Sequence, residues 1–374
     1  MDFKRSGVSR RLFVFAIGMA ALFLSCPSQP EEANPVSFGT IANATPNKRR
    51  LLRYLKDNYG KRVISGQMDT SWTTNTSMDM IARVFADTGK YPAIKGFDFI
   101  QLSLPHDKGG EQTNEAIEWW NGENNGETLV EGAHGIVTFC WHWKIGPDQQ
   151  FYTEDTDFRI PYRDGSLDTS SPDFTLIKND LETVAERLQE LADLDIPVLW
   201  RPLHEASGGW FWWGASGPGA YKALWAYIYD YLVNTKRLHN LIWVWNGQNA
   251  AWFPDAATVD IAGTDVYPNP PQNFSSQSTR FGETLMMVPD RNRIVALTEN
   301  GAIPDPDACM RDNAMWSWFM TWNDGYGSTP NQTREDNFWT GDWHNTLSHK
   351  QKVYNHDLVI TLDELPDLSK SPLE

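Results

Sequence analysis

The sequence predicts an α/β protein whose chain closes into a (β/α)8 TIM barrel. Three observations lead to this fold. Apolar runs typical of buried strands alternate along the chain with amphipathic stretches typical of helices. The strand runs are apolar nearly throughout, as in parallel sheets that helices cover on both faces. There are eight such runs, and eight βα repeats close a parallel sheet into a barrel.

The predicted strands follow one another at residues 62–68, 91–99, 135–143, 196–205, 241–246, 260–268, 293–301 and 315–323. Helix-like stretches lie between them, most clearly at 47–59, 173–192 and 220–234. The second of these repeats apolar residues at i, i+3 and i+4, as a helix with one buried face does. An open, doubly wound sheet is the alternative, but no Gly-rich phosphate loop follows an early strand.

The N-terminal segment has the pattern of a bacterial export signal. Basic residues precede an apolar run at 12–24, which is too short to span a membrane. The run leads into the letters FLSC, which resemble the lipobox of lipoprotein signals, where the cysteine, here Cys26, is acylated. We therefore predict a lipoprotein-type signal at 1–26, a flexible tether at 27–38 and one catalytic barrel domain at 39–374. An ordinary cleaved signal and a retained anchor are the alternatives.

Composition limits the partners of the protein. The chain has 32 Lys and Arg against 48 Asp and Glu, a formal net charge of −16 at pH 7, which argues against nucleic acid and anionic membrane surfaces. It has 18 Trp, more than packing requires, which favours flat ligands such as sugars. We expect an exported monomer that is either secreted or held at the cell envelope by its lipid alone.

Two cysteines, Cys140 and Cys309, lie within the predicted barrel. An exported protein can oxidise such a pair, but sequence does not show whether the two are close, so a disulfide stays open. Neither CxxC nor HExxH occurs in the sequence. We predict neither a metal nor a cofactor.

Polar and aromatic residues gather at the carboxyl ends of the predicted strands, where a barrel holds its chemistry. They are Asp98, His142, His204, Glu205, Asn246, Tyr267, Glu299 and Trp322. The two glutamates stand on the fourth and seventh strands, so we expect both to reach one bond at the barrel mouth.

Two carboxyl groups that flank one bond are the requirement of glycoside hydrolysis. One must hold a proton near neutral pH, and an aromatic wall raises a carboxyl pKa by disfavouring the charged form. The stretch WRPLHEASGGWFWWG at 200–214 places Glu205 beside such a wall, which also offers flat faces to a sugar. The sequence therefore predicts a site in which the aromatic residues and the carboxylate act together.

The motifs RPLHE and GGWFWWG, with CWHW upstream and DVYP and TENG downstream, resemble glycoside hydrolase family 26, whose members are chiefly β-mannanases. The resemblance runs from about residue 40 to the C-terminus. It implies a (β/α)8 barrel, retention of anomeric configuration, no metal, and mostly endo-attack on β-1,4-mannan, glucomannan or galactomannan.

The resemblance also implies roles for individual residues. Glu205 would be the acid/base and Glu299 the nucleophile. The other implied substrate-binding residues are His204 near the scissile bond, His142 and Trp210 around the cleaved sugar, and Tyr267, which would hydrogen-bond the nucleophile. Asp98 and Trp322 join this group mainly through their positions at strand ends, and Asp98 could instead only pair within the barrel.

Several other functions remain compatible with the sequence. An exo-acting enzyme that releases mannobiose, a β-1,3-xylanase and a lichenase share the same chemistry. A non-catalytic lipoprotein that binds glycans is the alternative from another class of protein, and it should lack one of the two carboxylates. This chain has both.

Overall fold

The computed structural model of the chain describes residues 36–70, 79–102, 109–146, 149–325, 329 and 331–370. The chain divides into Met1–Ala33 and Asn34–Glu374, and every described residue belongs to the second unit. The predicted signal at 1–26, with Cys26, and most of the predicted tether lie outside the described residues. Within the described ranges, no helix combines the length and the apolar character needed to cross a membrane.

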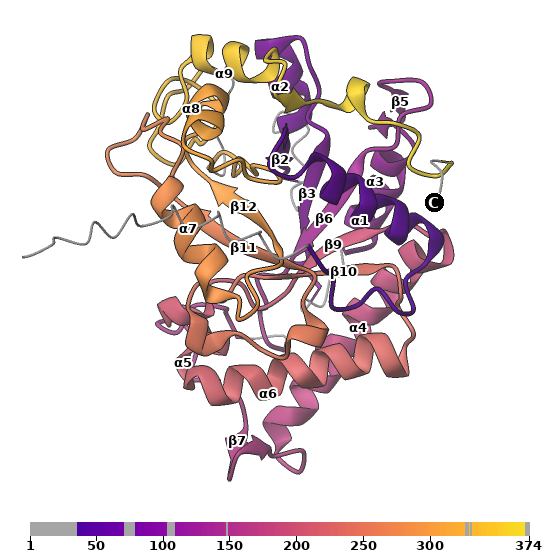
Figure 1. The fold of residues 1–374 in the computed structure, drawn as a ribbon. Helices are drawn as coiled ribbons and strands as arrows, with labels where there is room; N and C mark the ends of the chain where they lie inside the picture. The colour runs from indigo at the N-terminus through magenta and orange to yellow at the C-terminus, as the bar shows by residue number, and fades with distance from the viewer. Residues whose placement is uncertain are drawn as a thin grey trace, which may run out of the picture. The chain divides into compact units, whose positions relative to one another are not determined.

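A parallel sheet of seven strands forms the centre of this unit (Figure 1). Its strands are hydrogen-bonded in the order β12, β11, β10, β9, β6, β3 and β2. Their bounds are Gly66–Met68 (β2), Ile94–Asp98 (β3), Ile136–Cys140 (β6), Val198–Arg201 (β9), Leu241–Trp245 (β10), Ile261–Val266 (β11) and Ile294–Asn300 (β12). Nearly every residue in these strands is buried, which confirms that both faces of the sheet are covered.

Helices surround the strands, with α4 and α6 on one side of the sheet in Figure 1 and α2 and α9 on the other. Their bounds are Pro46–Asn58 (α1), Met80–Thr88 (α2), Gly109–Trp120 (α3), Pro172–Asp193 (α4), Trp212–Ala215 (α5), Gly217–Tyr229 (α6), Ser278–Met287 (α7), Pro306–Arg311 (α8) and Leu347–Tyr354 (α9). The helices predicted at 47–59 and 173–192 are confirmed. Both begin after a capping hydroxyl, that of Thr45 or Ser171, which accepts a backbone N–H of the first turn. The helix predicted at 220–234 corresponds to α6, which starts three residues earlier, at Gly217, and continues into a π-helical turn at Asp230–Thr235.

The segment predicted as the eighth strand, 315–323, closes the barrel through separate bridges rather than as a regular strand. On one side the N–H of Ser317 donates to Val295 O of β12 over 2.9 Å. On the other side the N–H of Thr321 donates to Gly66 O of β2 over 3.2 Å. The sheet is therefore a closed barrel, as predicted, and the open doubly wound alternative is wrong.

The predicted first strand, 62–68, is split in the structure. Its first part, β1 (Val63–Ile64), pairs with β13 (Val359–Ile360) near the C-terminus, and its second part is β2. Ser65 marks the division because its N–H and its hydroxyl both donate to Ile360 O. The first part of the predicted strand is thus paired with β13 from the C-terminal segment.

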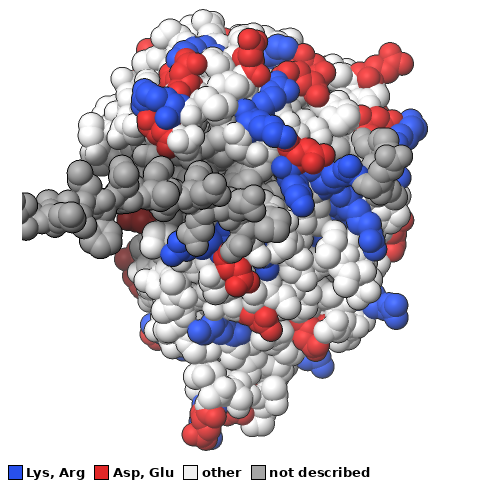
Figure 2. Space-filling model, viewed as in Figure 1, with Lys and Arg blue, Asp and Glu red and all other residues white. Residues whose placement is uncertain are grey.

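Shorter elements complete the fold. Two hairpins consist of β4 (Glu123–Asn124) with β5 (Glu127–Thr128) and of β7 (Tyr162–Arg163) with β8 (Ser166–Leu167). Cys140 and Cys309 are both buried free thiols, so they do not form the disulfide that the sequence left open. Figure 2 shows acidic and basic side chains intermixed on the described part of one face.

Replacement of Gly66 by Ala should destabilise the closure of the barrel. A Cβ at this position would lie 2.5 Å from Phe319 O and 2.8 Å from Met320 Cε, so the closing segment would have to move. We expect a loss of about 1 to 3 kcal/mol in the free energy of unfolding, measured by urea denaturation. Gly282→Ala on α7 is the matched control, because a Cβ there meets nothing within 4 Å. Equal stability of the two variants would contradict this account of the closure.

Candidate active site

The residues predicted for the site lie together at the carboxyl ends of the strands. Asp98 is the last residue of β3, Glu299 lies near the end of β12, and Tyr267 directly follows β11. Hydrogen bonds and ring contacts connect the predicted residues in pairs, as described below. The chain thus builds the site from segments that are distant in sequence, as a barrel with parallel strands requires.

Three carboxyl groups crowd the centre of the site. Glu205, Asp265 and Glu299 each place one carboxylate oxygen within 4.8 Å of the others. The sequence analysis did not select Asp265, although the DVYP motif contains it. A shift of register between β11 and β12 falls at Thr264 and Asp265, and an irregularity of this kind re-aims the side chains of a strand. It helps to place Asp265 beside the two predicted glutamates.

A buried cation, Arg201, holds two of these carboxylates. It is the last residue of β9, and its guanidinium donates to Asp265 Oδ2 over 3.1 Å and also to Glu299 Oε1. The side chains of all three residues are nearly inaccessible to solvent. The sequence analysis missed Arg201 as well, although the RPLHE motif begins with it. Its charge compensates carboxylates that burial would otherwise disfavour.

The negative charge of the Glu299 carboxylate is compensated by neighbouring groups. Burial raises the pKa of its carboxyl group, whereas the adjacent Arg201 guanidinium favours the ionised form. The hydroxyl of Tyr267 donates to Glu299 Oε2 over 2.7 Å, which confirms the predicted contact and also favours the carboxylate. Of these two groups, Arg201 has the larger effect on the pKa of Glu299.

Glu205 lies on a turn of unusual backbone geometry. Leu203 and Glu205 have φ angles of 53° and 54°, in the left-handed region that residues other than glycine rarely occupy. The N–H of Glu205 donates to Asn246 O over 2.7 Å and so ties the turn to the neighbouring β10 segment. Backbone strain of this kind is common where a site needs a side chain in a fixed direction.

The carboxyl group of Glu205 is placed to hold a proton. Burial raises its pKa to about 9, and the nearby carboxylates of Asp265 and Glu299 act in the same direction. The indole N–H of Trp210 donates to Glu205 Oε2 over 3.0 Å. Glu205 is therefore protonated at neutral pH, as the sequence predicted from the surrounding aromatic residues.

Aromatic rings line the site on its solvent side. The ring of Trp210 is 45% exposed and lies over Gly208, where a Cβ would fall 2.1 Å from the indole. Tyr267 is 42% exposed, and Tyr152, which the sequence analysis did not select, is 40% exposed and stacks on Phe211 at 5.4 Å. These rings offer faces to a flat ligand. The neighbouring Trp212 and Trp213, and Trp316 and Trp318 of the closing segment, are buried and serve packing.

A row of three hydrogen-bonded side chains lies beside the carboxyl groups. His142 Nδ1 donates to Asp98 Oδ2 over 2.5 Å, and His142 Nε2 is 3.2 Å from His204 Nε2. Burial opposes charge on His142, but the Asp98 carboxylate outweighs it and raises the pKa of His142. Burial lowers the pKa of His204 well below its usual value. A protonated His142 would thus donate to a neutral His204.

Asp98 therefore pairs within the barrel, through His142, rather than standing free in the cleft. The ring of His204 is hydrogen-bonded to His142. The ring of Trp322 meets that of His142 edge to face at 5.7 Å and is half-buried. All the predicted residues thus lie at or directly behind the same site.

Two groups of described residues could offer three ligand atoms to a metal ion. They are Glu205 with Asp265 and Glu299, and Asp98 with Cys140 and His142. Arg201 already supplies positive charge to the first group, and the hydrogen bond between Asp98 and His142 links two members of the second. A metal ion at either place would have to displace these contacts.

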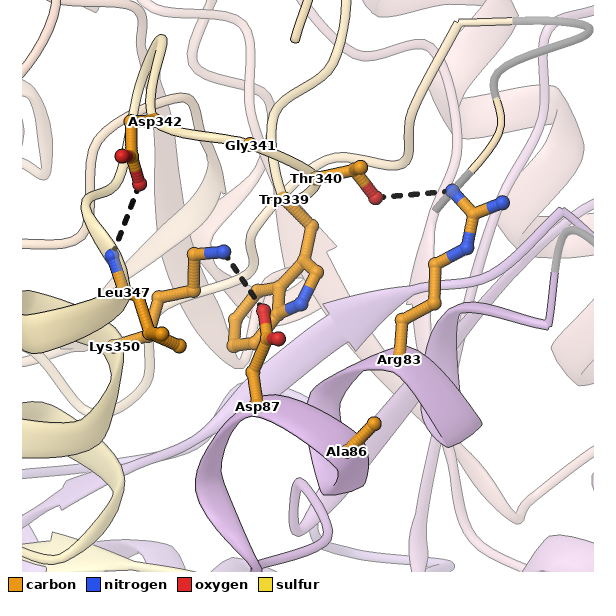
Figure 3. Close-up of a pocket in the computed structure, with 9 residues that line it drawn as sticks. All are labelled: Arg83, Ala86, Asp87, Trp339, Thr340, Gly341, Asp342, Leu347 and Lys350. Atoms are coloured by element: carbon orange, nitrogen blue, oxygen red, sulfur yellow. Dashed lines mark hydrogen bonds and ion pairs between the residues drawn. The ribbon is translucent and has the colours of Figure 1, made fainter. Parts of the chain in front are cut away.

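A separate cavity lies between α2, α9 and residues 339–342 (Figure 3). Its volume is about 290 Å³, and its charged residues pair with one another or with neighbours. Lys350 Nζ is 2.8 Å from Asp87 Oδ2, and Arg83 Nη1 is 2.6 Å from Asp324 Oδ2. This cavity lacks the crowded carboxyl groups of the barrel mouth, so we assign the active site to the mouth.

Comparison with known proteins finds a single enzyme family. The model of glycosyl hydrolase family 26 matches residues 41–364. The chain is 34% identical to a mannan endo-1,4-β-mannosidase of Thermothelomyces thermophilus, over 91% of this chain and 66% of that protein. It is also 34% identical to mannan endo-1,4-β-mannosidase B of Piromyces sp, over 88% of this chain and 54% of that protein. The chain thus spans between about half and two thirds of the length of these relatives.

Solved structures give the same picture. A GH26-CBM35 β-(1,4)-mannanase of Podospora anserina superposes with a TM-score of 0.73 at 33% identity, covering 91% of this chain and 71% of that one. A β-mannanase from a symbiotic protist of the termite Reticulitermes speratus, complexed with gluco-manno-oligosaccharide, gives a TM-score of 0.75 at 30% identity. That match covers 90% of this chain and 100% of the other.

Replacement of Arg201 by Met should strongly destabilise the protein at neutral pH. The variant would bury two carboxylates without their cation, and we expect a loss of about 3 to 5 kcal/mol in the free energy of unfolding. Because burial raises the pKa of Glu299, the folded variant takes up a proton as the pH falls through that pKa. The loss should therefore be largest above this pKa and shrink at acid pH.

Urea denaturation at neutral and mildly acidic pH measures this difference. Arg53→Met is the matched control, because Arg53 pairs with Asp57 at the surface, where both side chains are about half exposed or more. The control should change stability by less than about 1 kcal/mol at either pH. A small loss for Arg201→Met at neutral pH would show that its charge is not required by the carboxyl groups.

Proposed function

Because the chain belongs to glycosyl hydrolase family 26, we propose that it is a retaining endo-1,4-β-mannanase that hydrolyses mannan, glucomannan or galactomannan. One observation carries the proposal. Glu205 and Glu299 approach each other within 4.8 Å, and Arg201 and Tyr267 favour the ionised form of Glu299, whereas burial and the neighbouring carboxylates favour the protonated form of Glu205. A protonated carboxyl group beside a compensated carboxylate is the pair that double displacement at a sugar needs.

The first step would form a covalent glycosyl-enzyme intermediate. A carboxylate oxygen of Glu299 attacks the anomeric carbon while the carboxyl proton of Glu205 passes to the leaving oxygen. Arg201 and Tyr267 hold the Glu299 carboxylate in place through hydrogen bonds to both of its oxygens. The proximity of the two carboxyl groups supports this route, because inverting enzymes separate theirs by about 6.5 to 9.5 Å to admit a water molecule.

The second step would release the sugar with its original configuration. Glu205, now a carboxylate, takes a proton from water as that water attacks the anomeric carbon and displaces Glu299. Trp210 stays within hydrogen-bonding distance of Glu205 and donates to the ionised form. The same carboxyl group thus serves first as acid and then as base.

The aromatic side chains suit a sugar substrate. Trp210, Tyr267 and Tyr152 expose ring faces beside the carboxyl groups, where pyranose C–H groups can stack. We assign His142, His204 and Trp322 to the same sugar subsite, with Asp98 orienting His142. The choice of mannan rests on the relatives, which include mannan endo-1,4-β-mannosidases and a β-mannanase solved in complex with gluco-manno-oligosaccharide.

The purified protein should release reducing sugar from galactomannan and glucomannan, and much less from β-1,3-xylan or barley β-glucan. Early products should be oligosaccharides of several lengths, which product sizing by chromatography detects. Release of mannobiose as the only early product would instead indicate the exo-acting alternative. Activity confined to xylan or to barley glucan would contradict the proposed substrate. Glu299→Ala is the control for contaminating activity.

The two glutamates should differ in their response to azide. Glu205→Ala should lower kcat by about 10² to 10⁴-fold on a polysaccharide and should be rescued by azide on a substrate with a good leaving group, giving the β-azide. Glu299→Ala should lose the covalent intermediate, and any azide product should have the α configuration. NMR of the products measures both outcomes. Inversion of anomeric configuration by the wild-type enzyme would contradict the double-displacement mechanism.

A further inference from the structure

One polar side chain next to Glu205 has no part in the mechanism described so far. Gln248 follows β10 in a turn, is half-buried and has a φ of 55°. Its Nε2 lies 3.4 Å from Glu205 Oε1. Since the indole of Trp210 faces Glu205 Oε2 over 3.0 Å, each oxygen of Glu205 faces a side-chain N–H.

The orientation of the Gln248 amide is fixed by a cation. Arg280, in the first turn of α7, donates from Nη2 to Gln248 Oε1 over 3.1 Å, and Thr264 Oγ1 lies 3.4 Å from the same oxygen. A guanidinium can only donate, so the atom that faces it must be the amide oxygen. The amide nitrogen then has to face Glu205, because the opposite orientation would set an NH₂ group against the cation.

We propose that Gln248 is a positioning residue for the acid/base: held by Arg280, it donates a hydrogen bond to Glu205 and favours the ionised form. This role rests on the proposed function, in which Glu205 must act as a base in the second step. A carboxylate accepts hydrogen bonds at both oxygens, whereas a protonated carboxyl group presents a donor at one of them. The pair of N–H groups around Glu205 therefore stabilises the form needed to activate water.

The rest of the surroundings act mostly in the opposite direction. Burial and the carboxylates of Asp265 and Glu299 favour the protonated form of Glu205, whereas Arg201 favours the ionised form. The ionisable groups around Glu205 come from three places. The strand ends contribute Asp265, Glu299, Arg201 and Tyr267, and the loop that follows β6 contributes Tyr152. Helix α7 contributes Arg280, which acts through Gln248. Without Gln248, the protonated form of Glu205 should be favoured further, and the pKa of Glu205 should rise.

Two variants test the proposal, and a third serves as control. Gln248→Met keeps the length of the side chain but removes the donor, and Arg280→Met leaves the amide free to turn. Glu283→Gln is the control, because Glu283 pairs with Arg280 from the solvent side, at 3.1 Å and with half of its side chain exposed. Thermal unfolding checks that each variant is folded.

The first readout is the alkaline limb of kcat/KM against pH, which reports the loss of the Glu205 proton in the free enzyme. Both variants should move this limb to higher pH by about half a unit, because the ionised form has lost a hydrogen bond. Glu283→Gln should leave it unchanged. A shift in Gln248→Met alone would overturn the role given to Arg280.

The second readout uses an aryl mannobioside with a good leaving group, for which the second step limits kcat. Loss of the hydrogen bond that positions the base should lower kcat and KM together by about three- to tenfold and leave kcat/KM at the pH optimum nearly unchanged. An unmoved alkaline limb in both variants, or a rise in KM with unchanged kcat, would overturn the proposal and assign Gln248 to packing or to substrate contact. Failure of the proposed function is a separate result, since the wild-type protein would then be inactive on mannan.

Discussion

The structure of the site depends on one buried cation, the guanidinium of Arg201. Three carboxyl groups share a small volume at the barrel mouth, and in the absence of a cation burial and mutual repulsion would drive protons onto them. Arg201 donates to Asp265 and Glu299, whereas the two oxygens of Glu205 face the side-chain N–H groups of Trp210 and Gln248. The cation therefore separates the three groups into a compensated pair and a carboxyl group that holds its proton.

This asymmetry connects the fold to the chemistry. Arg201 ends β9, Asp265 lies in β11 and Glu299 in β12, so regular strands set the positions of the cation and its two partners. Glu205 instead lies beyond the end of β9 on a turn with left-handed residues. In the proposed mechanism, a rigid strand suits the carboxylate that attacks in one direction, and the tethered turn presents the proton donor to the leaving group.

Irregular backbone occurs at several positions of the site. The register shift at Asp265 and the left-handed φ angles of Leu203, Glu205 and Gln248 all fall at the mouth of the barrel. Gly208 is a further constraint at the mouth, because the indole of Trp210 occupies the space that a side chain would need. The regular barrel below can support these local costs, since its strands are buried and hydrogen-bonded on both sides.

The sequence by itself determined the barrel and the positions of Glu205 and Glu299, because apolar periodicity and strand ends are local properties of the chain. It also predicted the contact between Tyr267 and Glu299 through a family resemblance. Only the tertiary structure decided that Arg201, 64 residues before Asp265 and 98 before Glu299, joins them, and that Gln248 faces Glu205. It also decided that residues 315–323 close the barrel by separate bridges and that the two barrel cysteines remain free thiols. The reason is physical: a residue's partners across a sheet depend on strand order and register, and neither is encoded in the pattern of any single segment.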